Sequence, residues 1–155
     1  MTTVEIMRLS HAADLPLPSY ATEGSAGLDL LAAVDAEIEL KPGARLCVPC
    51  GIAMALPAGF EAQVRPRSGL ALHHGVTVLN APGTIDSDYR GEVKATLINH
   101  GETAFRITRG MKIAQLVIAR HETVELHEVG ELPASERGGG GFGSTGFHIA
   151  TKRTA

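Results

Sequence analysis

The sequence predicts an all-β domain built as a sandwich, a barrel or a jelly roll. Short apolar or alternating runs follow one another along the chain, with turn residues between them. The 155 residues include 18 glycines and 8 prolines, many for a helical protein. No segment keeps the i, i+3, i+4, i+7 apolar spacing of a helix over three turns. Strands at this spacing with Gly or Pro between them are typical of these architectures.

Each element is predicted from its local pattern. Alternation or a short apolar run between turn residues indicates strands at residues 4–6, 26–30, 38–40, 45–48, 52–56, 60–65, 76–79, 93–99, 105–107, 113–119 and 124–127. The best helical segment is Ser68–His74, one or two turns that begin behind a serine cap. The segment from Val76 to Ile85 is expected to form a hairpin.

The last quarter of the chain differs from the rest. Six of the ten residues from Arg137 to Gly146 are glycine. Such a segment cannot bury enough apolar surface to offset its ordering entropy. We therefore expect a β-rich core domain at 1–136 and a flexible arm at 137–155. The stretch from Arg137 to Gly146 also carries one arginine, one phenylalanine and a Gly-Ser-Thr-Gly run, which suit an anion-binding arm with one stacking ring.

Composition excludes several classes of function. A net charge of −3 and only six aromatic residues argue against a nucleic-acid binder. No apolar run approaches the roughly 18 residues of a membrane span. Cys47 and Cys50 are too few for a disulfide scaffold, and as a single C-x-x-C pair they are a weak metal or redox signal. A cytoplasmic protein without nucleic-acid or membrane partners is expected.

Five short segments carry residue types suited to phosphate, metal and water chemistry. Arg meets phosphate with a planar fork, and helix N-termini favour anions. Taken singly, these residues also have an ordinary structural explanation: Asp29 as an acid in a turn, Arg67 as a surface charge, and Asp86 and Asp88 as turn formers. Their joint presence in one order favours a functional site. The segments are AGLDL (26–30), RPRSGL (65–70), NAPGTIDSDYRG (80–91), RGMKIAQL (109–116) and RGGGGFGSTG (137–146).

In these five segments, which span residues 26–146, the sequence resembles the trimeric deoxyuridine triphosphatases (dUTPases). The resemblance implies an all-β, distorted jelly roll with one short helix and a flexible glycine-rich C-terminal arm. It implies a homotrimer with three sites at the subunit interfaces. Each site would take the first, second and fourth segments from one chain, the third from a neighbour and the arm from the remaining chain. The implied reaction is hydrolysis of dUTP to dUMP and pyrophosphate, which lowers dUTP and supplies dUMP for thymidylate synthesis.

The resemblance also implies a role for individual residues. Asp86 would orient and deprotonate the water that attacks the α-phosphorus, and Asp88 would hold the turn. Mg2+ would be bound mainly by the substrate phosphates and water, with Asp29 acting through a water molecule. The remaining substrate contacts would be Arg67, Ser68 and Gly69 on the phosphates; Asn80, Thr84 and Ile85 around uracil; Tyr89 under the deoxyribose; Gln115 on a phosphate or metal-bound water; Lys94 at a further position on the substrate; and Arg137, Phe142, Gly143, Ser144 and Thr145 on the closing arm.

Two other functions stay open at this stage. A dCTP deaminase-like enzyme has a related fold, but it would need a catalytic Glu beside the base and would lack the Tyr-bearing turn. A non-catalytic nucleotide sensor on the same scaffold would keep the phosphate contacts and could lose Asp86. The IDSDY sequence at 85–89 favours hydrolysis over both.

Overall fold

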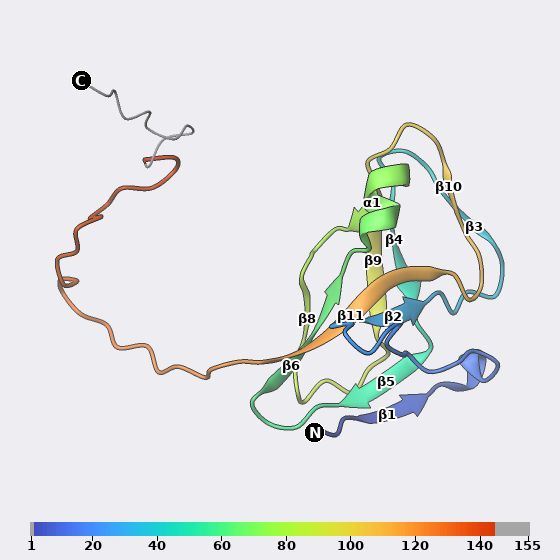
Figure 1. Cartoon of the computed structure of the whole chain (residues 1–155), viewed down its shortest axis with the longest axis horizontal. Helices are drawn as coiled ribbons and strands as arrows, with labels where there is room; N and C mark the ends of the chain where they lie inside the picture. The colour runs from blue at the N-terminus through green and yellow to red at the C-terminus, as the bar shows by residue number, and fades with distance from the viewer. Residues whose placement is uncertain (1, 145–155) are drawn as a thin grey trace. The chain divides into compact units, whose positions relative to one another are not determined.

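A computed structural model describes residues 2–144 of the chain (Figure 1). In this part the chain folds mainly into strands, with one α-helix and one turn of 3₁₀ helix. The helices are η1 (Ser10–Ala12) and α1 (Ser68–His74). The strands are β1 (Glu5–Arg8), β2 (Leu28–Leu31), β3 (Ile38–Leu40), β4 (Arg45–Pro49), β5 (Ile52–Ala55), β6 (Phe60–Arg65), β7 (Val76–Val78), β8 (Gly83–Ile85), β9 (Lys94–Asn99), β10 (Phe105–Ile107) and β11 (Lys112–Arg120).

The strands of the described residues pair into four small antiparallel sheets. The largest has the order β2-β11-β6-β8, and a second has the order β4-β9-β7. Two further pairs are β1-β5 and β10-β3. Most neighbours within a sheet are far apart in sequence, so contacts between distant segments hold the sheets together.

The alternation of side chains between the two faces of each strand decides which residues enter the core. On β6, Ala62 and Val64 are buried, while Glu61, Gln63 and Arg65 lie on the other face. Asn99 is the one buried polar side chain of the described residues, and its amide is fully bonded to backbone groups. The fully buried large side chains include Leu30, Leu40, Val48, Val76, Leu97, Ile107, Ile113 and Leu116.

The helix lies where the sequence predicts it, but its first turn differs. Arg67 is the N-cap residue and Ser68 is the first helical residue, so the expected serine cap is wrong. No side chain caps the helix, which leaves the Ser68 hydroxyl free of that task. The helix ends at Gly75, whose φ of 66° is left-handed and whose missing Cβ lets the Gly101 backbone approach.

Two other expectations are corrected. β7 pairs with β9 and β8 pairs with β6, so residues 76–85 cross between two sheets and do not form a hairpin. The alternating run 124–127 is not a strand. Its apolar residues Val124 and Leu126 are exposed, because alternation without a partner strand gives the backbone no ladder to join.

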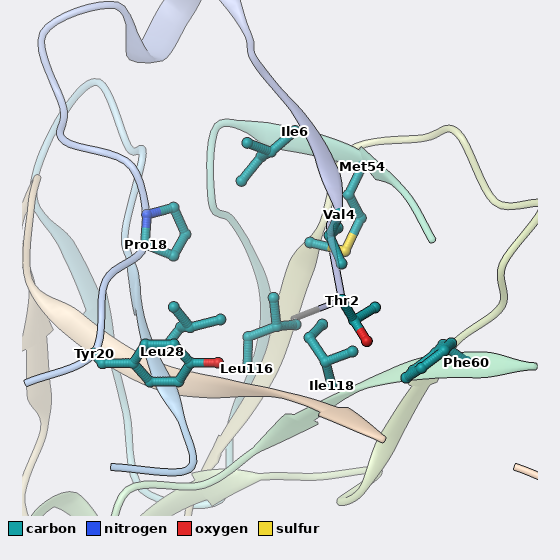
Figure 2. Close-up of a pocket in the computed structure, with 10 residues that line it drawn as sticks. All are labelled: Thr2, Val4, Ile6, Pro18, Tyr20, Leu28, Met54, Phe60, Leu116 and Ile118. Atoms are coloured by element: carbon teal, nitrogen blue, oxygen red, sulfur yellow. The ribbon is translucent and has the colours of Figure 1, made fainter. Parts of the chain in front are cut away.

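An apolar cavity of about 450 Å³ lies beside β1. Figure 2 shows its lining, which includes Val4 and Ile6 near the N-terminus, Tyr20 from the following loop, Phe60 of β6 and Ile118 of β11. Polar groups are few here, so this cavity is a poor match for a triphosphate.

A compact β-rich unit ends at Thr123, and a second unit begins at Val124. Residues 124–144 contain no helix or strand. The division after 136 that the sequence suggested stays a prediction. None of the helices in the described part is both long and apolar enough to cross a membrane.

Candidate active site

A cluster of charged side chains gathers at the β2 edge of the largest sheet. Asp29 on β2 has one carboxylate oxygen 2.6 Å from Lys112 Nζ and the other 3.4 Å from Arg67 Nε. Arg67 also donates from Nη1 to the Lys112 backbone carbonyl at 3.1 Å. The Asp29 side chain is only 17% exposed, so the pairing is shielded more than a surface ion pair is. This arrangement fixes two cations over one carboxylate.

Gln115 lies next to this cluster on β11. It is directly opposite Asp29 on one side and Arg65 on the other. Its Nε2 donates to the Pro66 carbonyl at 2.9 Å, which leaves its amide oxygen near Gly27. A Cβ at Gly27 would lie 2.3 Å from that oxygen, so a glycine is needed for Gln115 to take this position.

These residues border a cleft of about 480 Å³, which we call the cationic cleft. The first residues of α1, Ser68 and Gly69, also line it. Arginine, lysine, hydroxyl and amide groups in one cleft favour a polyanionic ligand. The polar side chains of the lining are Ser25, Asp29, Arg65, Arg67, Ser68, Lys112 and Gln115.

A second cleft, of about 290 Å³, lies beyond β8, and we call it the Asp86 cleft. Asp86 directly follows β8, and its side chain is exposed next to the buried Ile85. Thr84 and Lys94 line the same cleft. Asn80 lies in the turn before β8, where its amide nitrogen is close to Gly83.

Tyr89 closes one side of the Asp86 cleft. The turn that carries it is held by a hydrogen bond from the Tyr89 N–H to the Asp86 carbonyl, at 3.2 Å. The Tyr89 hydroxyl donates to the Glu92 carbonyl at 3.1 Å. A Cβ at Gly91 would lie 2.3 Å from this hydroxyl, so only glycine lets the ring fold back over the turn.

The far side of this turn is anchored through Glu92. One oxygen of its carboxylate accepts from the Gly51 N–H at 2.9 Å and contacts His11 Nε2 at 2.9 Å. His11 belongs to η1, which Arg109 also holds by donating to the His11 carbonyl at 2.6 Å. Arg109 binds the Asp14 carboxylate with two nitrogens and lowers the pKa of Asp14 to about 2.

In one chain, Asp29 of the cationic cleft and Asp86 lie on opposite edges of the largest sheet. Asp29 lies on β2 and Asp86 follows β8, and these strands are the two edges of a four-stranded sheet. Three strand spacings separate the edges, or about 14 Å. A single chain therefore presents two separate clefts, one lined by Arg65, Arg67 and Lys112 and the other by Asp86.

The glycine-rich segment begins with a compact turn. Arg137 Nε donates to the Gly140 carbonyl at 2.7 Å, and the Ser144 N–H donates to the Gly141 carbonyl at 3.0 Å. Phe142 is fully exposed with a φ of 48°, and Gly143 has a φ of 93°. Thr145, which the sequence also suggests as a contact, lies outside the described residues.

The comparisons with known proteins identify the family. A family model described as dUTPase matches residues 13–146, most of the chain. The chain belongs to the dUTPase family. A deoxyuridine 5'-triphosphate nucleotidohydrolase of Rhizobium rhizogenes is 56% identical over 146 residues, which cover 93% of this chain and 94% of that protein.

Solved dUTPase structures share the fold. The dUTPase of Staphylococcus bacteriophage 80alpha, solved with dUPNHPP, is 26% identical, with a TM-score of 0.85 over 95% of this chain and all of that one. A mutant dUTPase from phage phi11 of S. aureus, whose structure is described as showing a structural Mg(II) ion, is 22% identical, with a TM-score of 0.74 over 83% of this chain and 97% of that one. The comparisons confirm two predictions: the all-β, jelly-roll class and the hydrolysis of dUTP to dUMP and pyrophosphate.

The residues that line the cationic cleft fit a magnesium ion held mainly by phosphate groups and water. Within residues 2–144, no group of three or more His, Cys, Asp or Glu side chains is arranged to hold a metal. Asp29 is the one carboxylate that lines the cationic cleft, and each of its oxygens already faces a cation. Each oxygen has a second lone pair, which can accept from a metal-bound water. This donor set suits an ion held by phosphates and water, and does not suit a protein cage.

Sequence reasoning gave no individual role to several residues that line the two clefts. Arg65 and Lys112 line the cationic cleft, and Cys47 and Glu92 line the Asp86 cleft, but none was assigned a role in advance. The alternation of inward and outward side chains along β6 could have placed Arg65 on the outer face. Its position opposite Gln115 needs the pairing of β6 with β11, which no local pattern reveals.

Proposed function

We propose that the cationic cleft and the Asp86 cleft of each chain are two half-sites, and that three copies of the chain combine them into three active sites that hydrolyse dUTP to dUMP and pyrophosphate. The proposal is carried by the separation of Asp29 and Asp86 on opposite edges of one sheet. Asp86 of one chain would face the cationic cleft of a neighbour, and the arm segment would come from the remaining chain. Each site would thus draw on all three chains.

Asp86 would act on the attacking water. The water oxygen forms a bond to the α-phosphorus, the bond from that phosphorus to the bridging oxygen breaks, and pyrophosphate leaves. The proton of the water passes to the Asp86 carboxylate. The exposure of Asp86 at the end of β8 supports this role, because a general base needs a water within hydrogen-bond reach.

The Asp86 cleft would also recognise the nucleoside. Thr84, Ile85 and Lys94 line it and would surround uracil together with Asn80. The Tyr89 ring, fixed by its hydroxyl on Glu92, would pack under the deoxyribose and exclude a ribose 2′-hydroxyl. A rigid ring discriminates better than a mobile one, because it cannot retreat from the added oxygen.

The cationic cleft would hold the triphosphate. Arg67, Ser68 and Gly69 would contact its oxygens, with Gln115 on a phosphate or a metal-bound water. Mg2+, when bound, would neutralise part of the phosphate charge, with Asp29 accepting from one of its waters. Asp29 also keeps Arg67 in position.

The arm would close over this assembly. Phe142 would stack on uracil, and Arg137, Gly143, Ser144 and Thr145 would cover the terminal phosphate. Closure excludes water other than the attacking one. The reaction would lower dUTP and supply dUMP in the cytoplasm, a location that stays a prediction.

Asp86→Asn tests the proposal, with Asp88→Asn as a matched control in the same exposed turn. Asp86→Asn should bind dUTP and lose turnover by roughly 100- to 10,000-fold, the usual contribution of a general base. Asp88→Asn should keep most of its activity. Pyrophosphate release measures turnover, and calorimetry measures binding. Wild-type turnover by Asp86→Asn would exclude the assigned role.

The same assay separates the alternatives. Wild-type protein is incubated with dUTP, UTP and dCTP, with and without Mg2+. Release of ammonia from dCTP would indicate a deaminase, and nucleotide binding without pyrophosphate release would indicate a sensor. Sedimentation tests the assembly, since a monomer with full activity would contradict shared sites.

A further inference from the structure

Arg65 is a charged residue of the cationic cleft that the proposed function leaves without a role. It is the last residue of β6 and lies directly opposite Gln115 of β11. Gln115 is in turn directly opposite Asp29 of β2. Residues opposite one another on antiparallel strands share a face of the sheet. The row Asp29, Gln115 and Arg65 therefore runs across three strands along the cleft.

The charges of the cleft are unequally paired. Lys112 and Arg67 both contact the Asp29 carboxylate, at 2.6 and 3.4 Å. Among residues 2–144, no carboxylate lies within ion-pair distance of the Arg65 guanidinium, which instead binds a neutral amide oxygen. Arg65 is thus the cation of this cleft whose charge is left for an anionic ligand.

A side-chain ladder on β6 holds Arg65 in place. Glu61, Gln63 and Arg65 occupy alternate positions and lie on one face of the strand. Gln63 Oε1 accepts from Arg65 Nε at 2.8 Å and from Arg65 Nη2 at 2.5 Å. Gln63 Nε2 donates to Glu61 Oε1 at 2.6 Å, which turns the amide oxygen toward the arginine.

This ladder leaves Arg65 with capacity for a ligand. A guanidinium has five N–H donors, and Gln63 takes two of them, so three are free. An unrestrained arginine on the surface loses much rotamer freedom when it binds. Because Gln63 already restrains Arg65, less of that freedom is lost on binding.

We infer that Arg65 binds the β- or γ-phosphate of the substrate and that Gln63 is the residue that positions it. The inference rests on the proposed function, because the ligand it names is the triphosphate of dUTP. It adds a phosphate contact beyond Arg67, Ser68 and Gly69. Arg65 acts on substrate binding, and Gln63 acts through Arg65.

Arg65→Gln tests the contact, with Arg106→Gln as the matched control on the exposed face of β10. Loss of one charge-assisted contact should raise the KM for dUTP about tenfold. The kcat should stay within about twofold, because the contact is made in the ground state and the transition state alike. Inhibition by dUMP, which lacks the β- and γ-phosphates, should change less than about twofold.

Two results would overturn the inference about Arg65. One is a KM for dUTP within about twofold of wild type. The other is equal weakening of dUTP and dUMP, which would mean that Arg65 shapes the cleft and does not bind the distal phosphates. Failure of the wild type to release pyrophosphate would instead refute the proposed function itself.

Gln63 is tested separately, with a double variant. Gln63→Leu should raise the KM for dUTP about threefold, because the guanidinium loses the restraint of its two hydrogen bonds. In an Arg65→Gln background the same substitution should cause no further rise in KM, because Gln63 acts only through Arg65. A Gln63→Leu enzyme with an unchanged KM, or a double variant clearly weaker than Arg65→Gln alone, would remove the positioning role.

Discussion

Gly91→Ala is a small change that should disturb the nucleoside side of the site. An added Cβ would lie 2.3 Å from the Tyr89 hydroxyl oxygen and 2.5 Å from Cζ, whereas ordinary contact begins at 3.4 Å. The ring would have to move by about 1 Å, and a misplacement of that size near a reacting substrate can cost about 100-fold. The corresponding loss of transition-state stabilisation is about 2.7 kcal/mol.

The fold itself should tolerate this change. Losing the bond from Tyr89 to the Glu92 carbonyl costs about 1 kcal/mol. Replacing glycine by alanine stabilises the fold by about 0.4–1 kcal/mol where alanine can adopt the native backbone conformation, because the unfolded chain then has less conformational entropy. Gly91 does not have a positive φ, so the two effects should nearly cancel.

The assay is pyrophosphate release from dUTP and from UTP. We expect kcat/KM for dUTP to fall on the order of 100-fold. The ratio of kcat/KM for dUTP to kcat/KM for UTP should also decrease, because Tyr89 no longer blocks the position of the ribose 2′-hydroxyl. Gly24→Ala is the control, since a Cβ there meets nothing within 4 Å. If Gly91→Ala kept kcat/KM within about threefold of wild type, the reasoning about Tyr89 would be refuted.

Two further predictions concern the core. Asn99→Leu should lower the free energy of unfolding by about 3 kcal/mol, because two backbone carbonyls and one backbone N–H lose the buried amide that they bond to. Urea unfolding measures this free energy, and a loss under about 1 kcal/mol would contradict the prediction. Burial raises the pKa of the Cys50 thiol to about 12. A Cys47→Ser variant, in which Cys50 is the one remaining cysteine, should therefore take no iodoacetamide label at pH 8.5 while folded and one label in urea. Mass spectrometry counts the labels. Labelling of Cys50 at equal rates in both states would show that the thiol is open to solvent.

Local pattern was enough to predict most elements. The bounds of β3, β6, β10 and α1 agree with the expected ranges, because each combines alternation or a helical run with clear turn residues at its ends. The same reasoning failed at 124–127, where alternation is present but no described strand pairs with it. A strand needs a partner, and the partner is not written in the local sequence.

The candidate site was predicted by resemblance more than by pattern. Motif residues such as Arg67, Ser68 and Asp86 were found in advance because they belong to long, specific segments. Arg65 lies in one of these segments but received no role of its own, since its place beside Gln115 depends on two strands that lie 50 residues apart in the sequence. Cross-strand register is set by packing of the whole domain, so single-sequence reasoning does not reach it.

The placement of two unlike half-sites on opposite sheet edges has a genetic consequence. Under the proposed assembly, a chain that is damaged at Asp86 still offers an intact Ser68 edge to its neighbour, and the reverse holds for a chain damaged at Ser68. Two individually inactive alleles expressed together would then form mixed particles in which some sites receive only undamaged edges. Such complementation is denied to enzymes whose whole catalytic apparatus resides in one polypeptide.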